Sequence, residues 1–353
     1  MKPYAGIQQT SSSSHSQPLN HPHYFAGDVG HSTARLVLAS LEAQAEKLIH
    51  NGIAHSTSRV YTTAKNSYLK FCARLNFQPL PASEKMLILF IAELHQTKAM
   101  NTIHTYLAGV RHLHIVAGYS NPLQDTPRLQ LALRGCKRVK PPRPSPRLPI
   151  TPHILRKIKA RLSDGFEDIL IWAAMCLGFF GFLRAGEFTV DKKFDPAANL
   201  SCDDINIDSH THPSLIRVRI KRSKTDQFGS GAYIFLSRTS ADLCPVTALL
   251  SYLSVRPTNP GPLFIYQDGS CLSKVKLVQA LNQALLSVGI DPTSYKGHSF
   301  RIGAATTATA MGIEDSLIQR MGRWTSNAFR LYIRTPPEDL SKVCHILAQA
   351  PPS

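Results

Sequence analysis

The chain has 353 residues, of which 43% are hydrophobic, so it is long enough for two domains with packed cores. Its formal net charge of +17 favours a polyanionic partner, because each basic side chain laid on a phosphate releases condensed counterions. Charge alone leaves open a generally basic protein without such a partner. Seven scattered cysteines with no CxxC pair fit a reducing compartment and argue against a disulfide scaffold or a zinc ribbon.

Residues 1–30 are polar and rich in serine and histidine, which predicts a disordered tail and not a signal peptide. From residue 31 to residue 136, apolar side chains recur at three- and four-residue steps and predict a helical bundle. We expect its first helix over 36–49, an N-cap at Ser83 for a later helix, and a helix end near Gly118.

Residues 137–150 form a basic, proline-rich stretch between the two predicted domains. Proline fixes φ and lacks a backbone donor, so we expect an extended linker with no regular structure. A simple spacer is the alternative, but a spacer does not need so many cations. The stretch is therefore predicted to cross a nucleic-acid backbone through its five basic residues, Lys137, Arg138, Lys140, Arg143 and Arg147.

The second predicted domain, 151–353, opens with Thr151 as a helix cap and proline at the first helical position. The apolar run 169–183 is shorter than the roughly 20 residues of a bilayer span, which predicts a buried helix in a soluble, intracellular protein. Period-two alternation at 216–221 and the apolar segment 233–236 predict a strand hairpin, and helices follow from Cys244 onward. The predicted fold is mostly α with a small antiparallel β-sheet. The basic residues alternating along the first strand are predicted DNA contacts: Arg217, Arg219 and Lys221.

The segment 298–334 gathers an imidazole, a guanidinium, an indole and a phenol with no carboxylate cluster beside them, at His298, Arg301, Trp324 and Tyr332. These groups suit the binding of a phosphodiester and its attack by tyrosine. Each has an ordinary structural explanation when taken alone: HxxR occurs by chance at helix ends, and single aromatic residues are usually core or interface.

Upstream, Arg184 follows the buried helix directly, and Lys224 lies in the predicted hairpin loop. Arg184 could be a snorkelling cap, or a planar fork that clamps two phosphate oxygens and is oriented by Glu187 one turn later. Lys224 could be a solvated loop residue, or a mobile general acid that protonates a leaving oxygen.

In the order Arg184, Lys224, His298-x-x-Arg301, Trp324, Tyr332, the set resembles the active site of the tyrosine recombinases, the family of phage integrases and Cre. The resemblance is tight in motifs over 178–334 and only architectural over the N-terminal bundle. The LRAGE box and the GRW…YIR ending look most like recombinases of eukaryotic mobile elements, the DIRS-type retroelements and Cryptons. One position departs: the usual histidine nine residues before the tyrosine corresponds to Arg323, so we assign the role to Trp324 and keep Arg323 as a possible substitute.

The resemblance implies an N-terminal core-binding bundle and an α+β catalytic domain that cleaves DNA without metal, cofactor or ATP. Arg184 and Arg301 would hold the scissile phosphate, and Trp324 would donate a hydrogen bond to it. His298 would either hydrogen-bond to the phosphate or relay the tyrosine proton. Tyr332 would form a 3′-phosphotyrosine bond, and Lys224 would protonate the leaving 5′ oxygen.

It also implies double-stranded DNA as the partner and a homotetramer on paired sites, located in the nucleus if the host is eukaryotic and otherwise in the cytoplasm. The tetramer would be held by exchange of C-terminal segments, for which an apolar stripe in 335–350 is a candidate, or that stripe packs on its own domain. The stripe consists of Leu340, Val343, Ile346 and Leu347.

Three alternatives stay open at this point. A domesticated DNA-binding protein of the same fold would lack strand exchange, and a type IB topoisomerase-like enzyme would relax DNA by the same chemistry. A two-metal nuclease is the weakest alternative, because its candidate acids lack inward-facing spacing: Glu187, Asp203, Asp204 and Asp226.

Overall fold

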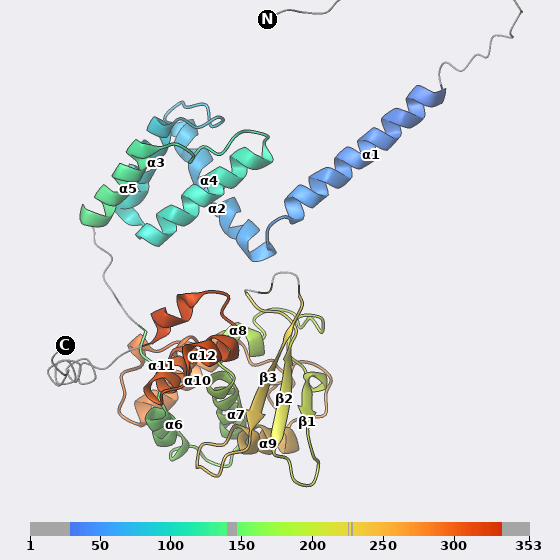
Figure 1. The fold of residues 1–353 in the computed structure, drawn as a ribbon, viewed down its shortest axis with the longest axis vertical. Helices are drawn as coiled ribbons and strands as arrows, with labels where there is room; N and C mark the ends of the chain where they lie inside the picture. The colour runs from blue at the N-terminus through green and yellow to red at the C-terminus, as the bar shows by residue number, and fades with distance from the viewer. Residues whose placement is uncertain (1–28, 140–146, 225, 227–228, 334–353) are drawn as a thin grey trace, which may run out of the picture. The chain divides into compact units, whose positions relative to one another are not determined.

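The computed structural model describes residues 29–139, 147–224, 226 and 229–333. The chain divides into two compact units, Met1–Pro142 and Arg143–Ser353, and the division falls inside the predicted linker. Each unit has its own hydrophobic core. The first is helical throughout and the second combines helices with a sheet, as Figure 1 shows for each unit.

The first unit contains five helices over the described residues. Local sequence explains the start of one of them: the Ser83 hydroxyl accepts a hydrogen bond from the backbone N–H of Met86, as its predicted capping role requires. Buried aromatic and aliphatic side chains of the last four helices, among them Tyr68, Phe71 and Phe90, form the core. The helices are α1 (Val29–Asn51), α2 (His55–Arg74), α3 (Glu84–Thr97), α4 (Met100–Val116) and α5 (Pro127–Val139).

Helix α1 forms where a first helix was predicted, but the prediction that it completes the bundle was wrong. Its large apolar side chains are exposed, with Leu36 at 70% and Leu48 at 68% of full exposure. Helix α5 closes the core instead, burying Leu129 and Leu133 against α3. A periodic apolar stripe predicts a helix but not which partner covers it.

The predicted linker begins too early. Helix α5 continues through Val139, so Lys137 and Arg138 lie in its last turn and are exposed. The prolines that exclude a helix start only at residue 141, and a basic last turn favours the helix through its macrodipole. Lys140 and Arg143 lie outside the described residues, and Arg147 is exposed at the start of the second unit.

The second unit is built around α7 (Phe166–Phe180), whose buried side chains contact α9 (Pro245–Val255) and α11 (Ser299–Ala310). Thr151 caps α6 (Pro152–Lys159) as predicted, accepting a bond from the N–H of Ile154. No helix in the described segments is long and apolar enough to cross a membrane, and the six cysteines there are free. The other helices are α8 (Ala185–Phe188), α10 (Lys274–Ser287), α12 (Asp315–Gly322), η1 (Cys202–Asp204), η2 (Pro292–Ser294) and η3 (Asn327–Tyr332).

A three-stranded antiparallel sheet completes the second unit, in the order β1 (Ile205–Ile207), β2 (Leu215–Ile220), β3 (Ala232–Ser237). The hairpin of β2 and β3 was predicted, whereas β1 is too short to give a period-two signal. In β2, Ile216, Val218 and Ile220 face the core, while Arg217 and Arg219 face outward. The fold is therefore the predicted combination of helices and a small sheet.

Candidate active site

Arg184 is positioned by a sharp reversal of the chain after α7. Phe182 adopts a left-handed backbone with φ 51°, and Arg184 then becomes the N-cap of the short helix α8. At Gly181 an added Cβ would lie 2.7 Å from the side chain of Ile234, so the turn packs closely on the sheet. The buried helix and the sheet together fix the place where the first guanidinium emerges.

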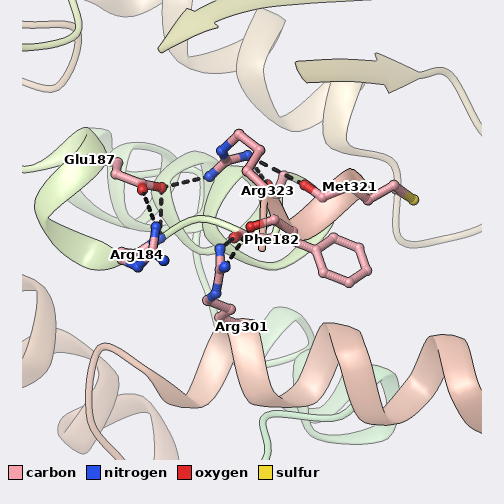
Figure 2. A network of polar contacts seen from close by, with 8 residues as sticks. Phe182, Arg184, Glu187, Arg301, Met321 and Arg323 are labelled. Atoms are coloured by element: carbon pink, nitrogen blue, oxygen red, sulfur yellow. Dashed lines mark hydrogen bonds and ion pairs between the residues drawn. The ribbon is translucent and has the colours of Figure 1, made fainter. Parts of the chain in front are cut away.

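Glu187 connects two arginines across the site (Figure 2). Its carboxylate accepts bonds from the Arg184 side chain at 2.9 Å and from the Arg323 side chain at 2.7 Å. The backbone N–H of Arg184 also donates to it, at 3.0 Å. The Glu187 side chain is only 4% exposed, so this double ion pair is shielded from solvent screening. Glu187 thus contacts Arg184, whose orientation it was predicted to set, and Arg323 is a second partner that was not anticipated.

Arg323 ends helix α12 with a left-handed backbone, φ 55°. This conformation is uncommon for a residue with a side chain, and here it turns the guanidinium toward Glu187. Burial, partly offset by Glu187, lowers the pKa of Arg323. Its Nε atom is buried and has no hydrogen-bond partner among the described residues.

Arg301 is completely buried, on the first turn of α11. Its guanidinium donates to the backbone carbonyls of Phe182 and Gly322, which come from the α7 turn and the end of α12 (Figure 2). Burial, and then the charge of Arg184, lowers the pKa of Arg301 to about 9, so the group stays charged at neutral pH. These two carbonyl partners are remote from Arg301 in the chain, so no local sequence pattern predicts them.

The Trp324 ring covers Arg301, with 3.9 Å between the guanidinium carbon and the ring centroid. A cation on an aromatic face in a desolvated site gains about 2 kcal/mol or more. The indole Nε1 is buried with no acceptor among the described residues. A buried N–H donor without an acceptor is uncommon in folded proteins.

Tyr332 closes the cluster at the end of η3. Its ring centroid lies 5.6 Å from that of Trp324 and 6.0 Å from that of His298, and its backbone carbonyl accepts a 3.0 Å bond from Thr306. The phenol therefore lies beside the predicted donors within the same chain. Of its two flanking arginines, Arg330 is ion-paired with Asp315 at 2.8 Å, and Arg334 lies outside the described residues.

His298 is the N-cap of α11, one turn before Arg301. Partial desolvation, followed by the charges of Arg301 and Arg184, lowers the pKa of His298 below its ordinary 6.5. The charges of Arg147 and Lys224 contribute to the same lowering of the pKa. The imidazole is therefore neutral at pH 7 and able to accept a proton.

Lys224 lies exposed in the loop between β2 and β3, as predicted. Asp226 shapes this loop by accepting backbone bonds from Ser230 at 3.0 Å and Gly231 at 2.7 Å. A hollow of about 290 Å³ is lined by Ser223 and Asp226 of this loop and also by Arg323 and Trp324. The lysine is thus carried by a segment that borders the site.

The three basic residues predicted to contact DNA from the strand that is now β2 differ in their surroundings. Arg217 and Arg219 are exposed on the outer side of β2, whereas Lys221 follows the strand and points inward. Its ammonium lies 2.7 Å from the buried carboxylate of Asp204. The predicted DNA contact of Lys221 does not fit this position, because the end of the strand breaks the alternation and a buried acid holds the charge.

The acids of the nuclease alternative are dispersed. Glu187 binds two arginines, Asp204 binds Lys221, and Asp226 binds loop amides. Within the described ranges, no group of three or more His, Cys, Asp or Glu side chains is arranged to hold a metal ion.

Comparison with known proteins gives a consistent result. No family model matches the chain. A curated relative, an integrase/recombinase XerD homolog of Selenomonas ruminantium, is 25% identical, and the match covers 81% of this chain and 83% of the relative.

Solved structures share the fold at low sequence identity. XerH recombinase, in a post-cleavage complex with its palindromic difH substrate, superposes with a TM-score of 0.58 at 17% identity, covering 84% of this chain and 86% of XerH. Lambda integrase, as a dimer bound to a COC′ core site, gives 0.56 at 13% identity over 84% and 95%. The Tn1549 transposon integrase with right-end DNA gives 0.54 at 14% identity over 86% and 98%.

The second unit brings Arg184, Arg301, Trp324 and Tyr332 together in one cluster. Over most of its length, the chain is therefore similar in sequence to a curated integrase/recombinase and similar in fold to recombinases and integrases of known structure.

Proposed function

We propose that this chain is a site-specific recombinase that breaks and rejoins DNA through a covalent bond at Tyr332. The observation that carries the proposal is the position of the Tyr332 ring, 6.0 Å from the His298 ring and 5.6 Å from the Trp324 ring in the same chain. A nucleophile, a neutral base and an unpartnered N–H donor thus meet at one place. This is the combination that an attack on a phosphodiester needs.

In the first step, the Tyr332 oxygen attacks phosphorus and its proton passes to the neutral imidazole of His298. The bond from phosphorus to the 5′ oxygen breaks, and Lys224 protonates that oxygen. The products are a 3′-phosphotyrosine and a free 5′ hydroxyl. Because the new bond retains the phosphodiester energy, a 5′ hydroxyl from another strand reverses the step without ATP.

Arg184 is the guanidinium best placed to receive the phosphate, since its side chain is partly exposed and is oriented by Glu187. Arg301 is closed in by Trp324 and by two carbonyls. A contact between Arg301 and phosphate therefore requires the Trp324 ring or the carbonyl partners to shift when DNA binds. The Trp324 N–H would then find its acceptor in the same phosphate.

Assembly and origin are further parts of this proposal. We propose double-stranded DNA as the substrate and a tetramer on paired sites, with nuclear action if the host is eukaryotic. The C-terminal stripe predicted to link the subunits lies outside the described residues. The resemblance to DIRS-type and Crypton enzymes stays a prediction.

The test is covalent trapping on DNA. The full chain is incubated in EDTA with a pool of nicked duplexes that carry a randomised site, and SDS-stable adducts are recovered and sequenced. We expect adducts from the unchanged chain, none from Tyr332→Phe, and adducts from the matched control Tyr266→Phe. Adducts that persist in Tyr332→Phe, or a pool that is bound but never trapped, would contradict the proposal. Plasmid relaxation without recombinant products would favour the topoisomerase-like alternative.

A further inference from the structure

The outer side of strands β2 and β3 carries two arginines and two aromatic side chains, which we call the stacking face: Arg217, Arg219, Tyr233 and Phe235. Both aromatic residues are largely exposed, Tyr233 at 54% and Phe235 at 58%. The opposite side of the same strands is buried in the core through Ile216, Val218, Ile234 and Leu236. Leaving two large rings in water on a sheet that has already buried its other side calls for a partner.

The strand register arranges the four side chains as a regular array. Arg217 pairs with Phe235 across the ladder, and Arg219 pairs with Tyr233. On the diagonal, the guanidinium carbon of Arg217 lies 5.0 Å from the Tyr233 ring centroid. Residues two apart on one face of a strand are separated by about 6.8 Å, so the two rings are spaced like successive bases of an extended single strand.

The charges of this face are uncompensated within the described residues. Neither Arg217 nor Arg219 takes part in any ion pair there, whereas Lys221, the next basic residue along, is held by Asp204. Two guanidinium groups without an ion pair in the described part of the chain, beside two exposed rings, suit a ligand that offers both phosphates and flat π-surfaces.

We propose that the stacking face binds unpaired nucleotides of a DNA strand, with bases on Tyr233 and Phe235 and phosphates on the two arginines. Bases in a duplex stack on one another and leave no free π-face, so a flat pair of rings favours unpaired bases. The site lies on the hairpin whose loop carries Lys224, but it includes none of the side chains proposed for catalysis. It therefore goes beyond strand cleavage: it would hold a strand that has lost its pairing partner.

The test measures binding of a short fluorescent oligothymidine, and separately of a duplex, to the full chain by anisotropy. We expect Tyr233→Ala with Phe235→Ala to weaken oligothymidine binding by about tenfold or more, with a much smaller effect on the duplex. The matched control is Tyr119→Ala, which removes an exposed aromatic side chain of the other unit and should change neither. Equal loss for both ligands, or no loss for oligothymidine, would overturn the proposal.

Photocrosslinking gives a second measurement that needs no variant. A 5-bromouracil oligonucleotide irradiated with the unchanged chain should label a peptide containing Tyr233 or Phe235, and labelling confined to other peptides would overturn the proposal. Light scattering tests whether the stacking face binds a second copy of the chain instead. If the double variant changes only the oligomeric state, the face joins copies of the chain and binds no DNA strand, and the proposal is wrong. Adduct formation at Tyr332 on nicked duplex reports separately on the proposed recombinase function.

Discussion

The guanidinium carbon of Arg301 lies 3.9 Å from the ring centroid of Trp324, and this contact covers a charge that has no exposed surface. The same indole carries a buried N–H without an acceptor among the described residues. One side chain therefore covers a cation and also presents a donor. The pair links helix α11 to the segment after α12. The same contact should therefore contribute both to the stability of the fold and to the proposed catalysis.

Replacement of Trp324 separates these two contributions. Trp324→Ala should lower the free energy of unfolding by about 3–5 kcal/mol, because it opens a cavity over Arg301. Trp324→Phe keeps a ring in place and should cost less stability, yet it should slow strand cleavage about 10²-fold, because the N–H donor is lost. Urea denaturation and single-turnover cleavage measure the two effects. Trp172 is the only other tryptophan of the chain, and Trp172→Phe serves as the control. Full cleavage activity of Trp324→Phe would rule out the indole as a hydrogen-bond donor.

Removal of the Glu187 charge should destabilise the second unit. In Glu187→Gln, Arg184 and Arg323 lose a carboxylate in a site where the three side chains are 4% to 16% exposed, and breaking such a buried pair costs about 3 kcal/mol or more. Chemical denaturation gives the value. Asp242→Asn is the matched control, since its ion pair with Arg156 is about half exposed and should contribute less than about 1 kcal/mol. Equal effects of the two substitutions would contradict the bridging role of Glu187.

The imidazole of His298 should make stability depend on pH. Its pKa is lowered in the folded chain, so below the ordinary value of 6.5 the unfolded state binds the proton more readily. Stability should therefore be full above pH 6.5, fall as the pH drops below it, and stop falling below the folded-state pKa. Denaturation midpoints across this range should be less pH-dependent in His298→Gln than in the unchanged chain. Identical pH profiles for His298→Gln and the unchanged chain would show that the pKa of His298 is the same in the folded and unfolded states.

The rate of strand cleavage should also depend on the protonation state of His298. Neutral His298 accepts the tyrosine proton, so the single-turnover rate should rise with pH through an apparent pKa below 6.5 and then level off. A rate that keeps rising steadily above neutrality would indicate a different base.

The affinity for DNA should fall steeply with salt, by about 0.9 in log K per unit of log salt concentration for each phosphate contacted. Lys137→Ala with Arg138→Ala removes two exposed cations from the last turn of α5 and should reduce the slope by up to about two such contacts. Titrations at several salt concentrations measure the slope. The control is Lys221→Ala, whose ammonium is held by Asp204 and should leave the slope unchanged.

The sequence by itself determined the chemical groups, their order and most of the elements that carry them. Apolar periods gave the helices of both units, the alternation at 216–220 gave the hairpin, and Ser83 and Thr151 marked helix starts, because these signals depend on residues only a few positions apart. The motif order also predicted a resemblance to the tyrosine recombinases, and the sequence relative and the fold agree with that resemblance.

Only the tertiary structure decided which partner each of two neighbouring side chains contacts. Arg323 and Trp324 are adjacent, yet the left-handed backbone at residue 323 sends the guanidinium to Glu187 and leaves the indole on Arg301. The carbonyl partners of Arg301 and the inward turn of Lys221 likewise depend on segments remote in the chain. A local pattern fixes which groups are present, whereas their direction follows from packing and from the nearest opposite charge, which sequence spacing does not encode.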